Sequence, residues 1–173
     1  MTISIDELNT LPDEEATDLF RSCCGASAWV SQMVKRRPFK SGDQLLQTAD
    51  RVWTDASLGQ QREAFDHHPR IGEKESATPQ SDRAREFSER EQSQIRLASS
   101  SAFDQMTLVN QAYEKKFGHI YIVSAAGKSA HELLDIARQR IRNDPDTELR
   151  VAAEEQRKIT RLRLQKLIGD EPG

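Results

Sequence analysis

The sequence SGDQLLQTADRVWTDA, residues 41–56, predicts the fold class more clearly than any other stretch of the chain. Its apolar residues recur every three or four positions, at Leu45, Leu46, Ala49, Val52, Trp53 and Ala56. This spacing places them along one face of an α-helix. Ser41 precedes the first of them, and serine is a favoured residue at the start of a helix. We therefore expect a helix from Ser41 whose apolar face packs into a core.

Similar start and stop signals recur on both sides of this segment. Towards the N-terminus, Thr10-Leu-Pro-Asp13 predicts the start of one helix, and Pro38 predicts the end of another that carries Trp29 and Met33. Towards the C-terminus, helices are expected over about 57–66, from Ser88 through Leu97, over 103–117 before Gly118, from Ser129, and from Asp144 to Ile168. Between them, Ile120–Val123 has the composition of a short extended segment.

About eight helices with almost no strand signal predict an all-α fold, a single compact bundle-like domain over residues 1–173. Hydrophobic residues make up 36% of the chain and charged residues 31%, a balance that fits helices with salt-rich solvated faces. The polar stretch from Glu73 to Asp82 is not expected to be a domain boundary. Neither side of it carries enough apolar residues to form a separate core.

The charge distribution argues against binding to nucleic acids. The chain has 25 Lys and Arg residues against 28 Asp and Glu residues, a net charge of −3. Basic and acidic residues alternate, as in Ser88-Glu-Arg-Glu91, instead of forming one basic face. A phosphate backbone requires such a face, so we expect no nucleic-acid partner.

The chain is expected to be cytoplasmic and not to bind membranes. No apolar run approaches the roughly 20 residues of a membrane span. The first ten residues lack the basic and apolar regions of a signal peptide, and the C-terminal Asp170-Glu-Pro-Gly173 is not a peroxisomal address.

Three features that resemble metal, redox or phosphate sites have ordinary structural interpretations. Cys23 and Cys24 are adjacent in an apolar helical stretch, so buried thiols are expected. The four histidines include no pair at the i, i+4 spacing of a helical zinc site, so we expect no metal. Ala126-Gly-Lys-Ser129 resembles the end of a phosphate-binding loop, but Ile122 occupies the position of the required first glycine, so a turn and a helix start are expected.

The segment His67-His68-Pro69-Arg70-Ile71-Gly72 is a candidate for chemistry. The proline after His68 disfavours helical backbone at that residue, so His68 is expected at a helix exit or in a loop. The proline also stiffens the chain, Arg70 adds a charge, and Gly72 permits a tight turn. By itself this pattern fits an exposed loop histidine as well as a general acid or base.

The segment Ser88-Glu89-Arg90-Glu91-Gln92 has the pattern of a helix start, with Ser88 as the cap and Glu91 three residues later. The first turn of a helix also offers unpaired N–H groups and positive potential to an anionic ligand. A carboxylate and a carboxamide in that turn could contact ligand nitrogens. The structural and the binding interpretations are both open at this point.

Six segments of the chain occur in a characteristic order. They are Cys23-Cys24-Gly-Ala-Ser-Ala-Trp29 with Arg37-Pro38-Phe39, Leu45–Trp53, His68–Gly72, Ser88-x-x-Glu91-Gln92, Asn110-x-x-Tyr113-x-x-x-Phe117-Gly118 with the apolar residues after it, and Glu148-Leu149 through Leu162-Arg163-Leu164. Together they resemble the 2-oxo-4-hydroxy-4-carboxy-5-ureidoimidazoline (OHCU) decarboxylase family along nearly the whole chain. Each segment alone is weak evidence for this family, but six segments in the family's order are specific to it.

The resemblance implies a set of site residues. The implied catalytic residues are His68, Glu91 and Arg163, in one pocket. The implied substrate-binding residues are Pro69, Ser88, Gln92 and the main chain of Ile122, Val123, Ser124 and Ala125. His68 is preferred to His67 because the family's histidine precedes proline, and Arg163 is preferred to Arg161 because Leu-Arg-Leu matches the family better.

The resemblance also implies an activity. Members of this family decarboxylate OHCU to (S)-allantoin without a cofactor, after urate oxidation and the hydrolysis of 5-hydroxyisourate. They are all-helical and commonly dimeric, so the expected partners are the small substrate and a second copy of the chain.

A different interpretation is a helical interaction module without catalysis. It predicts that the HPRIG segment, residues 68–72, and the SEREQ segment, residues 88–92, lie apart on the surface as a loop and a helix start. An enzyme needs both within reach of one small ligand.

Overall fold

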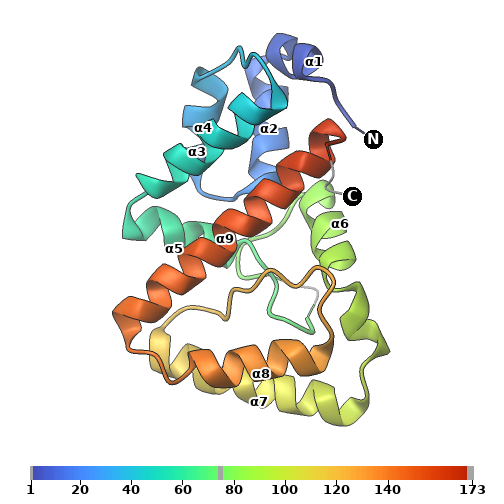
Figure 1. Ribbon diagram of the computed structural model, residues 1–173, viewed down its shortest axis with the longest axis vertical. Coiled ribbons are helices and arrows are strands. Elements are labelled where there is room, and N and C mark those ends of the chain that lie inside the picture. The colour runs from blue at the N-terminus through green and yellow to red at the C-terminus, as the bar shows by residue number, and fades with distance from the viewer. Residues whose placement is uncertain (1, 74–75, 171–173) are drawn as a thin grey trace. The chain divides into compact units, whose positions relative to one another are not determined.

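Every regular element formed by the described residues is helical. The computed structural model describes residues 2–73 and 76–170, so the expectations for residues 74–75 and 171–173 fall outside it. The helices are α1 (Ile5–Thr10), α2 (Asp13–Cys23), α3 (Ser27–Lys35), α4 (Gly42–Thr54), α5 (Leu58–Asp66), α6 (Asp82–Glu91), the 3₁₀-helix η1 (Ser93–Leu97), α7 (Ser100–Phe117), α8 (Ala130–Arg140) and α9 (Pro145–Ile168) (Figure 1). The all-α prediction is confirmed.

The helices form two compact units. The first contains the residues up to Ala64 and those from Arg157 onward, and the second contains Phe65–Gln156. Helices α5 and α9 each have residues in both units. The expectation of a single domain over residues 1–173 stays a prediction.

Helix α4 packs against α3 in the first unit and buries the apolar face that its spacing predicts. The Ser41 hydroxyl accepts the Gln44 N–H at 3.2 Å and starts the helix, and the face that carries Leu45 and Trp53 is buried. Trp29 of α3 packs against this helix and donates its indole N–H to the Ala49 carbonyl at 3.1 Å. Burial of such large side chains is the main source of stability in a helical unit of this size.

A short helix that sequence analysis did not predict, α1, is attached to this core. Ser4 and Glu7 form a reciprocal capping box at its start. The Arg37 guanidinium donates to the carbonyls of Leu8 and Leu11 at 2.9 and 2.7 Å and so satisfies the end of the helix. Six residues are too few to display helical periodicity, and the capping box was the available signal.

The predicted buried thiols are confirmed. Cys23 and Cys24 are both free and buried. Burial raises the pKa of the Cys24 thiol to about 11, so this side chain stays protonated at neutral pH.

Helices α7 and α8 lie side by side in the second unit (Figure 1). Tyr113 and Phe117 of α7 pack with His119 and Tyr121 in an aromatic cluster beneath α8. Gly118 ends α7 at φ 77°, a left-handed conformation that glycine adopts without steric cost. The predicted start of α8 is also confirmed, because Ser129 and Glu132 form a capping box.

The predicted helix start at Ser88 is wrong. Helix α6 begins several residues earlier, where the Ser81 hydroxyl accepts the Ala84 N–H at 3.2 Å, and Ser88 lies in its last turn. The helix ends at Glu91, and residues 93–97 form a separate 3₁₀-helix. Ala84 and Phe87, which precede Ser88, already belong to α6 and are buried. The Ser88 hydroxyl therefore cannot cap the start of a helix. Ser88 therefore offers no helix N-terminus to an anion, and that prediction is wrong.

Replacing Ser81 with alanine should lower the free energy of unfolding by about 1 kcal/mol, because the Ala84 N–H loses its capping acceptor. Urea denaturation followed by circular dichroism measures the change. Ser93→Ala, at an exposed serine in η1, is the matched control and should be nearly neutral. Equal losses in both variants would contradict this helix start.

No helix among residues 2–73 and 76–170 combines the length and the apolar character needed to span a lipid bilayer.

Candidate active site

The HPRIG segment forms a turn that two side chains of α7 hold in place. Arg70 makes a two-point ion pair with Glu114 of α7, with N–O distances of 2.9 and 2.8 Å. These hydrogen bonds raise the pKa of Arg70, so its guanidinium stays charged. Glu114 pairs with that charge. Asn110 of α7 donates to the Ile71 carbonyl at 3.1 Å. Gly72, at φ 91°, closes the turn.

His68 follows α5 closely, as predicted for a residue at a helix exit, and its side chain is buried. Its Nε2 lies 2.7 Å from Oε1 of Gln156 on α9. When the amide oxygen accepts this hydrogen bond, Nε2 carries the proton and Nδ1 is the basic nitrogen. The contact therefore orients the ring, which an acid–base catalyst requires.

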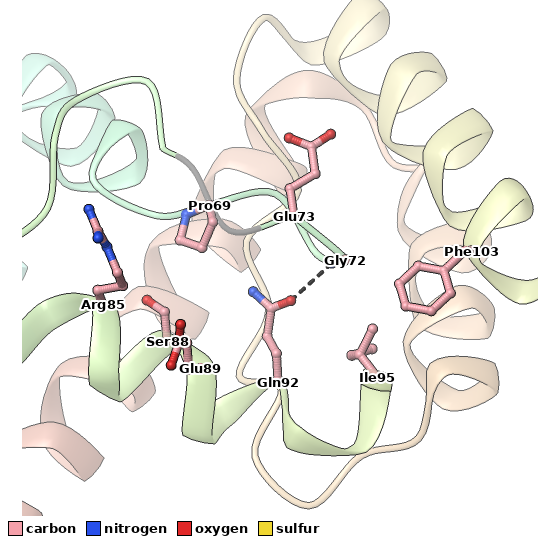
Figure 2. Close-up of a pocket in the computed structure, with 9 residues that line it drawn as sticks. All are labelled: Pro69, Gly72, Glu73, Arg85, Ser88, Glu89, Gln92, Ile95 and Phe103. Atoms are coloured by element: carbon pink, nitrogen blue, oxygen red, sulfur yellow. Dashed lines mark hydrogen bonds between the residues drawn. The ribbon is translucent and has the colours of Figure 1, made fainter. Parts of the chain in front are cut away.

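The HPRIG and SEREQ segments meet in the second unit (Figure 2). The Gly72 N–H donates to Oε1 of Gln92 at 2.9 Å. Pro69 from the first segment and Ser88 and Gln92 from the second line one cavity of about 140 Å³. A non-catalytic module predicts that the segments lie apart, and the structure places them together.

The walls of this cavity combine apolar and charged groups. Ile95 and Phe103 supply an apolar side (Figure 2). The charged residues Glu73, Arg85 and Glu89 complete the lining together with Gly72. Such a site fits a small polar ligand with an apolar face. The described lining includes neither His68 nor Glu91.

The other two predicted catalytic residues are placed in different units. Glu91 is the last residue of α6 in the second unit and is half-buried. Arg163 is buried in the first unit, where its Nη1 donates to the Ser22 carbonyl at 3.2 Å. Arg161, the alternative to Arg163, is engaged by Asp50 at 2.8 Å. The convergence of the three catalytic residues on one ligand stays a prediction.

The predicted substrate-binding segment Ile122–Ala125 belongs to neither a helix nor a strand, and all four of its residues are buried. Three side chains hold its main chain. Arg140 donates to the Ile122 carbonyl at 2.6 Å, Lys128 donates to the Ser124 carbonyl at 2.8 Å, and Glu155 accepts the Ser124 N–H at 3.3 Å. The segment is not part of the described cavity lining.

Arg140 is itself held by a buried carboxylate. Its Nε donates to Oε1 of Glu148 at 2.8 Å, and its Nη2 lies 2.6 Å from the same oxygen at an angle that makes no hydrogen bond. Tyr113 donates its hydroxyl to this oxygen, and Asn143 donates to Oε2 at 3.0 Å. Burial, and then the hydrogen bond to Glu148, raise the pKa of Tyr113, so the phenol stays a donor.

The AGKS sequence, interpreted as structural, behaves as expected. Ala126 and Gly127 form a turn, and Ser129 starts α8, so the AGKS sequence is a turn and a helix cap. Within the part of the chain that the structure describes, no cluster of three or more His, Cys, Asp or Glu side chains is arranged to hold a metal ion.

Three residues that contact the predicted site residues were not predicted from the sequence: Gln156, Lys128 and Arg140. For Gln156 a signal was available, because it stands four residues after Ala152 and three before Ile159 in the apolar pattern of α9. A polar residue in such a pattern is expected to have a buried partner. Lys128 and Arg140 occupy ordinary helix-flanking positions, and their contacts depend on the path of residues 122–125.

Comparison with known proteins gives a consistent result. The family model described as OHCU decarboxylase matches residues 9–165. A solved structure described as OHCU decarboxylase in the presence of (S)-allantoin is 35% identical and superposes with a TM-score of 0.77, covering 88% of this chain and 99% of that one.

Two curated relatives extend the comparison. The uric acid degradation bifunctional protein of Arabidopsis thaliana is 35% identical over 157 residues, which cover 91% of this chain and 48% of that protein. This chain therefore spans about half the length of the plant protein. The 2-oxo-4-hydroxy-4-carboxy-5-ureidoimidazoline decarboxylase of Haloferax volcanii is 25% identical over 170 residues, which cover 98% of both chains.

Proposed function

Because the chain belongs to the OHCU decarboxylase family, we propose that it decarboxylates OHCU to (S)-allantoin in urate breakdown, without a cofactor. The observation that best supports a working site is the junction of the HPRIG and SEREQ segments. Pro69, Ser88 and Gln92, three of the residues expected to bind substrate, come from these segments and line one cavity. A small ligand in that cavity would contact both segments at once.

The reaction consists of one bond cleavage and several proton movements. Cleavage of the bond to the carboxylate releases CO₂ and leaves the electron pair in the imidazoline C=N system, whose nitrogen takes up a proton. The ring hydroxyl then loses its proton and becomes a carbonyl, while the ureido-bearing carbon is protonated on one face. The net change is the uptake of one proton, and the choice of face makes the product (S)-allantoin.

His68 is proposed to remove or relay the hydroxyl or ring proton. The 2.7 Å contact with Gln156 supports this role, because it holds the imidazole in one orientation. Acid–base assistance of this kind contributes roughly 10²–10⁴-fold to the rate.

Glu91 and Arg163 are proposed to bind the two polar ends of the substrate. Glu91 would accept hydrogen bonds from ring or ureido nitrogens, and Arg163 would clamp anionic or carbonyl oxygens with its forked donors. The preference for Arg163 over Arg161 is supported by the contact that engages Arg161 with Asp50. Either His68 or Glu91 is proposed to deliver the last proton of the reaction, the one that is added to the ureido-bearing carbon.

The assembly and location are proposed from the resemblance alone. We propose a homodimer, the arrangement that is common in the family, in the cytoplasm. Light scattering after size-exclusion chromatography measures the mass in solution, and a mass of 19.6 kDa would correspond to a monomer and contradict the dimer.

The activity is tested by generating OHCU freshly from urate and following (S)-allantoin by circular dichroism. The protein should produce an optically active signal faster than the spontaneous decay of OHCU, which gives racemic allantoin. Prior treatment with EDTA should leave the rate unchanged, since the proposed reaction uses no metal. Decay at the spontaneous rate, without optical activity, would show that the chain is not this enzyme.

A further inference from the structure

Arg85 gives the cavity in the second unit a positive charge that the described residues leave unpaired. It lies on α6 three residues before Ser88, and both residues line the cavity (Figure 2). Arg85 is exposed, and its guanidinium forms neither an ion pair nor a hydrogen bond within residues 2–73 and 76–170. The charge is therefore available to a ligand that enters the cavity.

Two carboxylates line the same cavity, but neither pairs with Arg85 in the described part of the chain. Glu73 lies 3.6 Å from Arg70, whose own charge offsets that of the carboxylate. Glu89 follows Arg85 by four residues on α6, a spacing at which oppositely charged side chains can meet on a helix. The guanidinium of Arg85 is thus not used in an ion pair there, although two carboxylates line the cavity with it.

The proposed reaction changes the charge of its ligand. OHCU carries a carboxylate, which is ionised at neutral pH because the usual pKa of such a group is about 4. The reaction releases this carboxylate as CO₂ and takes up one proton, so the product, (S)-allantoin, is neutral. A cationic residue in the cavity therefore attracts the substrate by its charge and loses this attraction once the product has formed.

We infer that Arg85 is a specificity-determining residue, which favours the anionic substrate over the neutral product at this cavity. The inference rests on the proposed function and makes it more specific. The role differs from that proposed for Arg163, whose donors would bind carbonyl as well as anionic oxygens and so would hold substrate and product alike. Attraction by Arg85 acts on binding, before the bond to the carboxylate breaks, and its loss afterwards favours release of the product.

Replacing Arg85 with glutamine is the direct test, because glutamine keeps a polar side chain that suits a helix and removes the charge. At about 10 mM salt, where the Debye length is roughly 30 Å, KM for OHCU should rise roughly fivefold with kcat within about twofold. At about 1 M salt, where the Debye length is roughly 3 Å, the variant and the wild type should have KM values within about twofold of each other. Inhibition by (S)-allantoin should be unchanged at both salt concentrations.

Two further variants separate the charge at this position from other effects. Arg85→Lys keeps a cation and should restore KM to near the wild-type value. Arg83→Gln is the matched control, because it removes the same charge from the same helix at a residue outside the described cavity lining. It should leave KM nearly unchanged.

A wild-type KM in Arg85→Gln at low salt, or an equal rise in Arg83→Gln, would overturn the inference while the wild-type enzyme remains active. An equal weakening of inhibition by (S)-allantoin in Arg85→Gln would also overturn it, because Arg85 would then bind substrate and product without regard to their charge. A wild-type chain that does not decarboxylate OHCU would instead overturn the proposed function itself.

Discussion

Replacing His68 with asparagine is expected to lower kcat for OHCU decarboxylation by roughly 10²–10⁴-fold, the usual contribution of a positioned acid–base group. Asparagine keeps a polar side chain that can still reach towards Gln156, but it cannot take up and release a proton near neutral pH. The measurement is the initial rate of (S)-allantoin formation at saturating OHCU, with the helical content of the variant checked by circular dichroism.

His67→Asn is the matched control, because His67 is adjacent in the chain and only half-buried. It should retain turnover within about threefold, since a residue that does not take part in proton transfer contributes little to it. If His67→Asn were inactive and His68→Asn active, the assignment of the catalytic histidine would be reversed.

Replacing Glu148 with leucine is expected to lower the free energy of unfolding by about 3–5 kcal/mol, because the Arg140 charge would be left buried without its partner. Glu148 is fully buried and accepts from Arg140, Tyr113 and Asn143. A loss of this size is a large share of the roughly 5–15 kcal/mol that stabilises a folded domain. Urea denaturation gives the value directly.

The double variant Arg140→Met with Glu148→Leu tests the cause of that loss. Removing both charges should recover part of the stability, since apolar side chains of similar volume often replace a buried ion pair at little cost. Arg138→Met is a matched control on the same helix, where Arg138 lies 3.7 Å from Asp135 at the surface. Its effect should be at most about 1 kcal/mol. A Glu148→Leu variant as stable as Arg138→Met would refute the interpretation.

The helices could be predicted from sequence wherever a local cap and an apolar face agreed. At α4 and α8 the capping serine and the buried stripe indicate the same start, and the predicted bounds of α9, from Asp144 to Ile168, agree with the structure. At α6 they disagreed. The Ser88–Glu91 pattern resembles a cap, but Ala84 and Phe87 before it are buried on the helix that Ser81 starts. A burial pattern spanning two turns outweighs a four-residue motif.

The candidate site could be predicted only as a list of residue types. Resemblance identified Pro69, Ser88 and Gln92, and the structure brings them to one cavity. The partner of His68 could not be obtained in this way, because Gln156 is 88 residues away in the chain and no local rule joins them. Contacts over such separations depend on the packing of whole helices, which spacing within one helix does not determine.

The positions of the tryptophans provide an optical probe of whether the chain unfolds in one cooperative step. Both indoles of the protein, Trp29 and Trp53, are buried in the first unit, whereas both tyrosines, Tyr113 and Tyr121, are buried in the second. Indole emission therefore reports solvent entry into one unit, while backbone ellipticity reports the melting of both. If the unfolding transitions followed by the two signals coincide, the chain unfolds as one cooperative body. If the transition in indole emission comes before that in ellipticity, the two units unfold separately.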